Sequence, residues 1–223
     1  LVCPRAALAE NATQLTSIMV QTVERPAALS GVLRDRRLNA VCIGPGYGTG
    51  PAVKEAVSTI LRARRGSVLD ADALTGFADA PEALFARLHG ECVLTPHDGE
   101  FSRLFGRPPP GGTERERAVQ EAARQAGCTV LLKGPDTILA DPSGAVTVIS
   151  ARGDAAAPWL ATAGSGDVLA GLICGLLARG FSPGQAAQTG AYLHGCAGRH
   201  LGAGLISEDL PEALPAVFAE LGV

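Results

Sequence analysis

The sequence lacks the features that mark membrane-spanning, secreted and nucleic-acid-binding proteins. No apolar run reaches the ~18 residues that a membrane-spanning helix needs, and no signal peptide is present. The six cysteines never pair as CxxC, and four of them lie in apolar runs, as small buried side chains do in a reducing compartment. We therefore expect a cytoplasmic protein with no membrane partner.

Long basic stretches are also missing. The net charge is −3 at pH 7, and the basic patches are confined to the short segments 34–37 and 62–65. Nucleic acids bind extended basic surfaces, so we expect no nucleic-acid partner. Only 18% of the residues are charged and 47% are hydrophobic, which is enough to bury the core of one domain.

Several common catalytic signatures are absent as well. The chain has no GxSxG nucleophile elbow and no GxxxxGK[ST] phosphate loop. No spacing of His, Cys and Asp indicates a transition-metal site. Any chemistry must therefore come from other patterns, and we predict no set of metal-ligating residues.

Short β-rich runs alternate with helix-like segments along the chain. The predicted strands are 17–23, 40–43, 67–69, 92–94, 129–132, 138–140 and 146–149. The predicted helices are 51–64, 81–88, 99–105, 113–126, 166–179, 183–200 and 208–221. This alternation predicts an α/β fold with a parallel or mostly parallel sheet covered on both faces.

Polar, glycine-rich loops follow four of these strands. They read GPGYG at 44–48, DAD at 70–72, TPHDGE at 95–100 and KGPDT at 133–137. Because ligands bind at the carboxyl ends of parallel strands, we expect these loops to lie together at one edge of the sheet. Each also has a purely structural alternative: an ordinary turn, a helix cap, a favourable charge in a first helical turn, or a hairpin with a solvated lysine.

Several side chains in these loops suit a phosphorylated ligand. Lys133 can reach a phosphate, Glu100 can help to bind a magnesium–phosphate complex, and His97 can donate to a substrate amide or hydroxyl. Asp72 can hold a magnesium-bound water or order its loop. His194 falls within a helix pattern, where a core or surface role is favoured.

The strongest signal is the segment 161–179, ATAGSGDVLAGLICGLLAR. A turn of small residues that leads into a helix leaves N–H groups free for an anion, and glycine lets a phosphate approach the backbone closely. Asp167 lies where the turn becomes helix, so we hypothesise a phosphoryl-transfer site with Asp167 as its base. The alternative is that Asp167 only caps the helix. Gly171 and Gly175 share the helix face opposite the apolar stripe and predict close packing there.

Taken together, these stretches resemble the ribokinase-like superfamily and, more narrowly, the ADP/ATP-dependent NAD(P)H-hydrate dehydratase family. The combination of TPHxGE with AGSGDVLAG is specific. Asp98, Trp159 and Ala163 stand where the family usually has Pro, Gly and Gly. The stretches that carry the resemblance are IGPGYG (43–48), VLDADAL (68–74), LTPHDGEFSRL (94–104), LLKGPDTILADPSG (131–144), LATAGSGDVLAGLICGLLARG (160–180) and GAYLHGCAGRHLGAGLISEDL (190–210).

The resemblance implies a three-layer α/β/α ribokinase-like sandwich with a mostly parallel central sheet. Members of the family begin with a glycine-rich strand–helix segment that this sequence lacks. We therefore expect residues 1–223 to form a single dehydratase domain that is N-terminally incomplete. The family also implies a homo-oligomer, a tetramer, with an epimerase domain fused to it or acting as its partner.

The implied reaction is the repair of the S-form of hydrated NADH or NADPH (NAD(P)HX), catalysed by a lyase. ADP or ATP, with Mg²⁺, phosphorylates the hydroxyl at C6 of the reduced ring, and phosphate then leaves to restore NAD(P)H. Phosphate is a far better leaving group than water, which explains why a dehydratase consumes a nucleotide. By resemblance, Asp167 is catalytic and contacts the substrate with Gly46, His97 and Glu100, and the nucleotide-binding residues are Lys133, Gly134, Thr137, Gly164, Ser165 and Gly166.

Two alternatives remain open from the sequence. One is a small-molecule kinase of the same superfamily that phosphorylates a vitamin-precursor alcohol and releases the stable ester. The other is a non-catalytic nucleotide-binding fragment.

Overall fold

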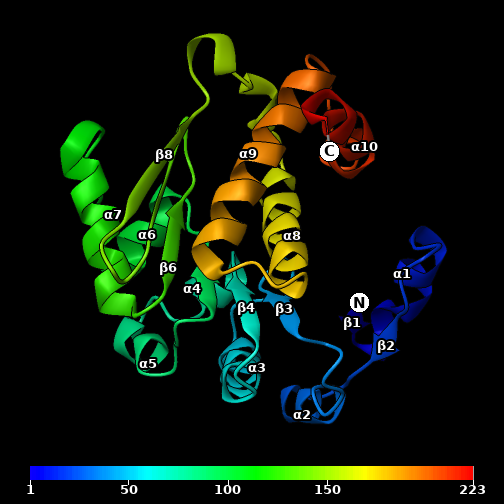
Figure 1. Ribbon diagram of the computed structural model, residues 1–223. Coiled ribbons are helices and arrows are strands. Elements are labelled where there is room, and N and C mark those ends of the chain that lie inside the picture. Colours follow the sequence, from blue (N-terminus) through cyan, green and yellow to red (C-terminus); the bar gives the residue numbers. More distant parts are fainter. Residues whose placement is uncertain (223) are drawn as a thin grey trace.

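A six-stranded sheet with helices on both faces forms the body of the protein (Figure 1). The computed structural model describes residues 1–222, Asp154 by its backbone alone. Strands β3 to β6 run parallel, and β7 is antiparallel to both of its neighbours. The predicted mostly parallel sheet is therefore confirmed. The strands lie in the order β3 (Ala40–Ile43), β4 (Gly66–Leu69), β5 (Cys92–Leu94), β6 (Thr129–Leu132), β7 (Asp136–Ala140) and β8 (Val146–Ser150).

Helices cover the sheet as the alternation of elements predicts, and each predicted helix is present with small shifts of its ends. One face is covered by α3 (Pro51–Arg62), α4 (Asp72–Thr75), α5 (Pro81–Phe85), α6 (Asp98–Phe105) and α7 (Gly112–Ala126). The other face is covered by α8 (Ser165–Ala178) and α9 (Pro183–Leu201), and α10 (Asp209–Leu221) packs on α9. None of the helices in the described part of the chain has the length and apolarity that crossing a membrane requires.

The N-terminal elements lie to one side of the six-stranded sheet, beyond β3 (Figure 1). They are β1 (Val2–Cys3), α1 (Leu8–Gln14), β2 (Gln21–Thr22) and α2 (Leu29–Val32), and β1 and β2 pair as a separate parallel sheet. The predicted strand 17–23 is wrong in extent, because only Gln21–Thr22 is extended and paired. Ile18 and Met19 are 55% and 89% exposed, so this run has no core against which a longer strand would bury its side chains.

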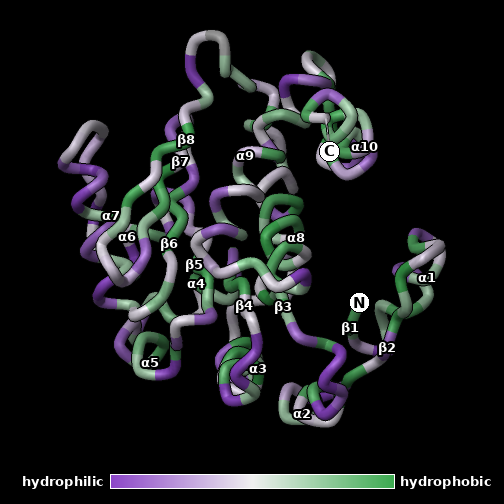
Figure 2. The backbone as a smooth tube through the Cα atoms, viewed as in Figure 1, coloured by the Kyte–Doolittle hydropathy of each residue, from purple (hydrophilic) through white to green (hydrophobic). Residues whose placement is uncertain are grey.

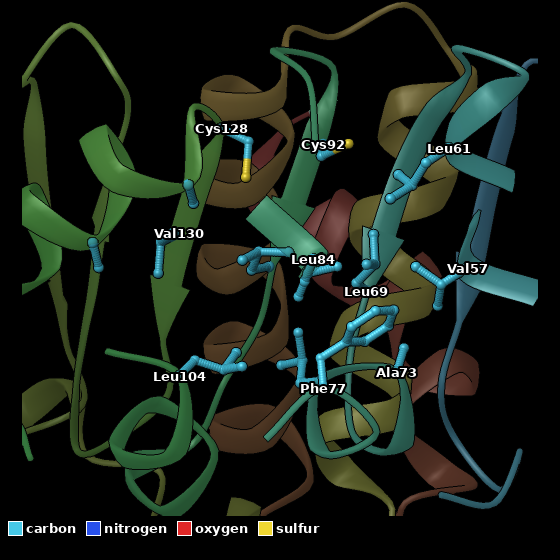
Figure 3. Packing of buried hydrophobic residues seen from close by; sticks show 14 of the residues in the cluster. Val57, Leu61, Leu69, Ala73, Phe77, Leu84, Cys92, Leu104, Cys128 and Val130 are labelled. Carbon is cyan, nitrogen blue, oxygen red and sulfur yellow. The ribbon is translucent and has the colours of Figure 1, made fainter. Parts of the chain in front are cut away.

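Successive side chains of the central strands point into two separate cores, because side chains alternate between the faces of a strand. Leu69 and Val130 point into the larger core with Phe77 and Leu84 (Figure 3). Val68, Val93 and Leu131 point to the opposite face, beneath α8 and α9. Each large side chain buried in this way contributes about 1.5–3 kcal/mol, so both cores hold the sheet edge that carries the loops in place.

Helix α8 is hydrophobic along most of its length (Figure 2). Leu169, Ile173 and Leu177 pack into the core beneath it. The close packing predicted for Gly171 and Gly175 is contradicted, because a Cβ added at either position would meet no atom within 4 Å. These glycines instead border a hollow of about 410 Å³ between α8 and α10. The core-facing stripe packs α8 on the sheet, and no side chain caps the first turn of the helix.

Candidate active site

The loops that follow the parallel strands meet at one edge of the sheet, as the sequence predicts. The Asp70 amide donates to the Ile43 carbonyl (3.1 Å), which joins the ends of β4 and β3. The Lys133 amide donates to the Pro96 carbonyl (2.9 Å), which joins the end of β6 to the TPHDGE loop. Backbone hydrogen bonds thus fix these loops relative to one another before any ligand arrives.

The first two loops interlock at very close range. Gly44 has a φ of +133°, and a Cβ at this position would lie 1.7 Å from the Asp70 carbonyl oxygen. The Gly48 amide donates to the Asp72 carboxylate (2.7 Å), so Asp72 orders the GPGYG turn. Ala71, between the two acids, has a φ of +45°, a strained value for a residue with a Cβ. Such strain persists only where surrounding contacts enforce it and is commonest at functional sites.

Asp70 is a site residue that the sequence-based prediction missed. Its side chain is fully buried, and its Oδ1 accepts a hydrogen bond from Lys133 Nζ at 2.7 Å. Its other oxygen, Oδ2, is buried without a hydrogen-bond partner among the described residues. The pair connects the ends of β4 and β6, and it holds the lysine at the edge of the sheet instead of leaving it solvated.

Helix α8 begins at this edge without a side-chain cap. Gly164 precedes it in the left-handed region (φ +81°), and its carbonyl accepts from Val168 N at 3.1 Å. Among the described residues, no acceptor lies within hydrogen-bond reach of the amides of Gly166 and Asp167. Lys133 Nζ would lie 3.2 Å from a Cβ on Gly166. Free amides, the positive end of the helix dipole and an ammonium group therefore converge, which suits a phosphate.

Asp167 lies beside this anion site, in the first turn of α8. Partial burial raises the pKa of its carboxyl group, the negative charges of Asp70 and Asp72 raise it further, and Lys133 opposes them. The raised pKa makes the carboxylate a better proton acceptor than an ordinary surface aspartate. The charges of Asp70 and Lys133 are close enough to affect the pKa of Asp167. These three residues therefore share one site, although they come from three different loops.

Ser165, the first residue of α8, is held from below by His194 of α9. His194 Nε2 lies 3.1 Å from Ser165 Oγ and 3.0 Å from the Ser165 carbonyl oxygen. Both residues are buried. Burial lowers the pKa of His194 to about 4, and the nearby charge of Lys133 contributes to this shift. His194 is therefore neutral at physiological pH. The sequence pattern favoured a core or surface role for it, but its side chain contacts Ser165 of the site.

His97 and Glu100 form a capping box at the start of α6. His97 Nδ1 accepts from the amides of Gly99 (2.9 Å) and Glu100 (3.3 Å), and a Glu100 carboxylate oxygen accepts from the His97 amide (2.9 Å). Nδ1 is thereby fixed as an acceptor, so a neutral His97 carries its proton on Nε2. Its side chain is more than half exposed at the sheet edge, and Nε2 lies 3.4 Å from a Glu100 carboxylate oxygen.

Three other predicted residues belong to the turn after β3 and to the hairpin of β6 and β7. Gly46 occupies an exposed turn with a φ of +65° and open space around it. Gly134 is exposed in the turn between β6 and β7, and its carbonyl accepts from the Thr137 hydroxyl (3.2 Å). No hydrogen bond within the described residues connects these three to Asp167. Asp98, which departs from the family pattern, forms an ion pair with the buried Arg115.

The side chains at this edge can bind magnesium only together with the phosphates of a nucleotide. No three His, Cys, Asp or Glu side chains gather as a metal cage within the described residues. Mg²⁺ in nucleotide-binding sites is usually held by one or two carboxylates together with the phosphates of the substrate. The free, buried Oδ2 of Asp70 suits this mode.

A solved ribokinase-like superfamily protein from Enterococcus faecalis shares this fold, with a TM-score of 0.77 and 22% identity over 98% of this chain and 75% of that chain. A family model described as NAD(P)H-hydrate dehydratase matches residues 1–214. The chain belongs to the NAD(P)H-hydrate dehydratase family, as the sequence resemblance indicates.

Two curated relatives and one solved structure illustrate the similarity. The bifunctional NAD(P)H-hydrate repair enzyme of Moorella thermoacetica is 40% identical over 98% of this chain and 43% of its own length. The ADP-dependent (S)-NAD(P)H-hydrate dehydratase of Cenarchaeum symbiosum is 43% identical over 57% of this chain and 44% of its own length. The chain thus matches less than half the length of either relative.

The solved structure is the ADP/ATP-dependent NAD(P)H-hydrate dehydratase from Bacillus subtilis, co-crystallised with ATP and Mg²⁺. It superposes with a TM-score of 0.73 and 27% identity, over 97% of this chain and 76% of that chain. The shared fold confirms the predicted three-layer architecture.

Proposed function

We propose that this chain catalyses the nucleotide-dependent dehydration of the S-form of hydrated NADH or NADPH, with ADP or ATP as the phosphoryl donor. One observation carries the proposal: the uncapped start of α8 faces Lys133 and lies beside the perturbed carboxylate of Asp167. The family membership of the chain and the names of its relatives support the choice of substrate.

In the first step, Asp167 accepts the proton of the C6 hydroxyl while the hydroxyl oxygen forms a bond to the transferred phosphorus. The bond between this phosphorus and the nucleotide breaks at the same time. The free amides of Gly166 and Asp167 hold the phosphoryl oxygens as charge builds on them, and Lys133 adds a positive charge above them. Phosphoryl transfer depends on positioning and electrostatics, so a site made largely of backbone is adequate for it.

In the second step, the bond between C6 and the phosphate oxygen breaks. The ring nitrogen donates its electron pair to expel the phosphate, the departing phosphate takes a proton from the neighbouring ring carbon, and the ring double bond of NAD(P)H is restored. The Nε2–H of His97 is suited to bind a carbonyl or hydroxyl of the hydrate, near Gly46 and Glu100. Gly134 and Thr137 border the nucleotide.

Bound magnesium would neutralise the phosphate charge. The free oxygen of Asp70 would hold the magnesium ion together with the phosphates. Asp70 also keeps Lys133 over the start of α8. The same buried carboxylate therefore serves both cations of the site.

The product assay tests this function. The purified chain is mixed with hydrated NADH and Mg²⁺, with ADP or ATP, and the absorbance of the dihydronicotinamide ring is followed. We expect nucleotide-dependent recovery of NADH. A stable phosphate ester would identify a kinase of the superfamily instead, and nucleotide binding without any turnover would identify a non-catalytic module.

We also propose that the domain works in the cytoplasm as a homo-oligomer and acts beside an epimerase domain. The relative from Moorella thermoacetica is named as bifunctional, and this chain matches 43% of it. A second activity in the remaining part of that relative agrees with an epimerase domain beside this one.

A further inference from the structure

We propose that His194 is a positioning residue for phosphoryl transfer: it holds the Ser165 hydroxyl so that this group donates its proton to a phosphate oxygen of the bound nucleotide. The inference rests on the proposed function for the identity of the ligand. It assigns a role to His194, a buried residue that neither the motifs nor the mechanism above uses.

The geometry fixes where the proton of the imidazole resides. His194 Nε2 lies 3.0 Å from the Ser165 carbonyl oxygen. A carbonyl oxygen can only accept, so Nε2 must carry the proton and donate it. The opposite tautomer would set a nitrogen lone pair against the carbonyl lone pairs in a buried place, where an unmade hydrogen bond is costly.

The same argument fixes the direction of the serine hydroxyl. Ser165 Oγ lies 3.1 Å from the same Nε2. Because Nε2 already carries a proton, Oγ can only accept there, and its own proton needs another acceptor. The described side chains and carbonyls provide Ser165 Oγ with no second hydrogen-bond partner. The O–H is therefore free to donate to a ligand bound at the start of α8.

Local electrostatics keep this arrangement constant. Burial lowers the pKa of His194 to about 4, so the imidazole stays neutral and retains one tautomer at physiological pH. The neighbouring amides of Gly166 and Asp167 have no acceptor among the described residues. The hydroxyl thus adds a third donor to these two at one anion site, and a hydrogen bond to a charged phosphate is stronger than one between neutral groups.

Two variants of His194 separate positioning from packing. In His194→Gln, the side-chain amide reaches as far as Nε2 and can donate in its place. In His194→Asn, the same amide is one methylene shorter and cannot reach Ser165. We expect the affinity for ADP and for ATP with Mg²⁺, measured by calorimetry on the full chain, to fall about 10-fold in the Asn variant and to stay within about 3-fold in the Gln variant.

A double-mutant cycle with Ser165→Ala tests the coupling. Ser165→Ala alone should weaken nucleotide binding about 10-fold, and adding His194→Asn should change it by less than about 2-fold. Independent, multiplying effects would overturn the proposal, as would equal losses in the Gln and Asn variants. If the Asn variant does not fold, unchanged nucleotide affinity in Ser165→Ala overturns it alone.

A matched control lies on the same helix. His200 is partly exposed and pairs with Glu220 at the surface, so His200→Gln should leave nucleotide affinity unchanged. In steady-state assays the KM for nucleotide should rise in His194→Asn while the KM for hydrated NADH stays constant, whereas a loss of packing would shift both. Normal nucleotide binding without NADH recovery would reject the proposed function and spare this inference; a wild-type chain that binds neither nucleotide would reject both.

Discussion

Helices α6 and α8 both begin at the carboxyl edge of the sheet, but their first turns differ. At α6, the amides of Gly99 and Glu100 are satisfied by the imidazole of His97. At α8, no side chain caps the helix, and Lys133 lies over Gly166 instead. One helix start is closed by its own sequence, and the other is left open beside a positive charge.

The difference teaches that an anion site depends on what a helix start leaves unsatisfied. Each helix begins with backbone amides that need acceptors. A capping box supplies those acceptors from within the chain and stabilises the helix. A run of small residues supplies none, so the unsatisfied amides at α8 are available to a ligand. The stability that α8 forgoes at its first turn is supplied by the core beneath Leu169 and Ile173.

The largest effect is expected from breaking the buried pair that holds Lys133 over α8. Lys133→Met leaves the buried Asp70 carboxylate without its counter-charge and should lower the free energy of unfolding by about 3–5 kcal/mol. Asp70→Asn leaves the partly exposed Lys133 unpaired and should cost less. Denaturant titration measures this loss, and nucleotide affinity should fall with it. The double variant should cost less than the two single costs together. A loss below about 0.5 kcal/mol in both single variants would show that the pair does not organise the site.

The next effect comes from filling each helix start with a side chain. Gly166→Val should push Lys133 aside and weaken ADP and ATP binding about 100-fold, because its Cβ would lie 3.2 Å from Lys133 Nζ. The matched change at α6 is Gly99→Ala, whose Cβ would lie 2.8 Å from His97 Cε1. It should lower the melting temperature and leave nucleotide affinity unchanged. An equal loss of nucleotide affinity in both variants would show that the N-termini of α6 and α8 do not differ as anion sites.

A smaller effect separates the two roles of His97. His97→Ala removes the cap and should cost about 1 kcal/mol of stability. His97→Asn keeps a good capping residue but loses the exposed Nε2–H, so stability should be close to wild type while the KM for hydrated NADH rises. Thermal unfolding and steady-state kinetics measure the two quantities. An unchanged KM in both variants would restrict His97 to capping.

The smallest effect is a shift in pH dependence at α8. Burial raises the pKa of Asp167 above its usual 3.8, and a general base must be ionised to act. The turnover rate should therefore fall on acidification with a midpoint above pH 3.8. Because folding disfavours the ionised form, stability from this group declines as pH rises through the raised pKa, and Asp167→Asn should slightly raise the melting temperature at neutral pH. A midpoint at or below 3.8, or a lower melting temperature, would contradict this environment.

The fold and the position of the site could largely be predicted from the sequence. Strands such as 40–43, 92–94 and 129–132 are apolar along their length and end in glycine, proline or polar residues, so their bounds are predicted correctly. Because the carboxyl ends of parallel strands share one edge, the convergence of their loops follows as well. The segment 17–23 failed because its apolar residues remain exposed, and periodicity cannot reveal whether a neighbouring strand is there to pair with it.

The partnerships inside the site could not be predicted in the same way. Asp70 and Lys133 are 63 residues apart, and nothing local shows that one holds the other. The sequence did hold a signal for this pair. A buried acid at a strand end needs a cation, and Lys54 and Lys133 are the chain's only lysines. His194 and Ser165 meet only through the packing of α9 on α8. The capping role of His97 was hidden because histidine is an uncommon cap.

The most direct test of the open helix start is the Asp167→Asn variant, assayed for turnover and for nucleotide binding together. If the free amides and Lys133 bind the phosphates while Asp167 serves as base, NADH recovery should fall by about 1000-fold or more. The dissociation constants for ADP and ATP should stay within about 3-fold of wild type. A variant that keeps its turnover, or one that loses nucleotide binding as severely as turnover, would contradict this division of roles within the first turn of α8.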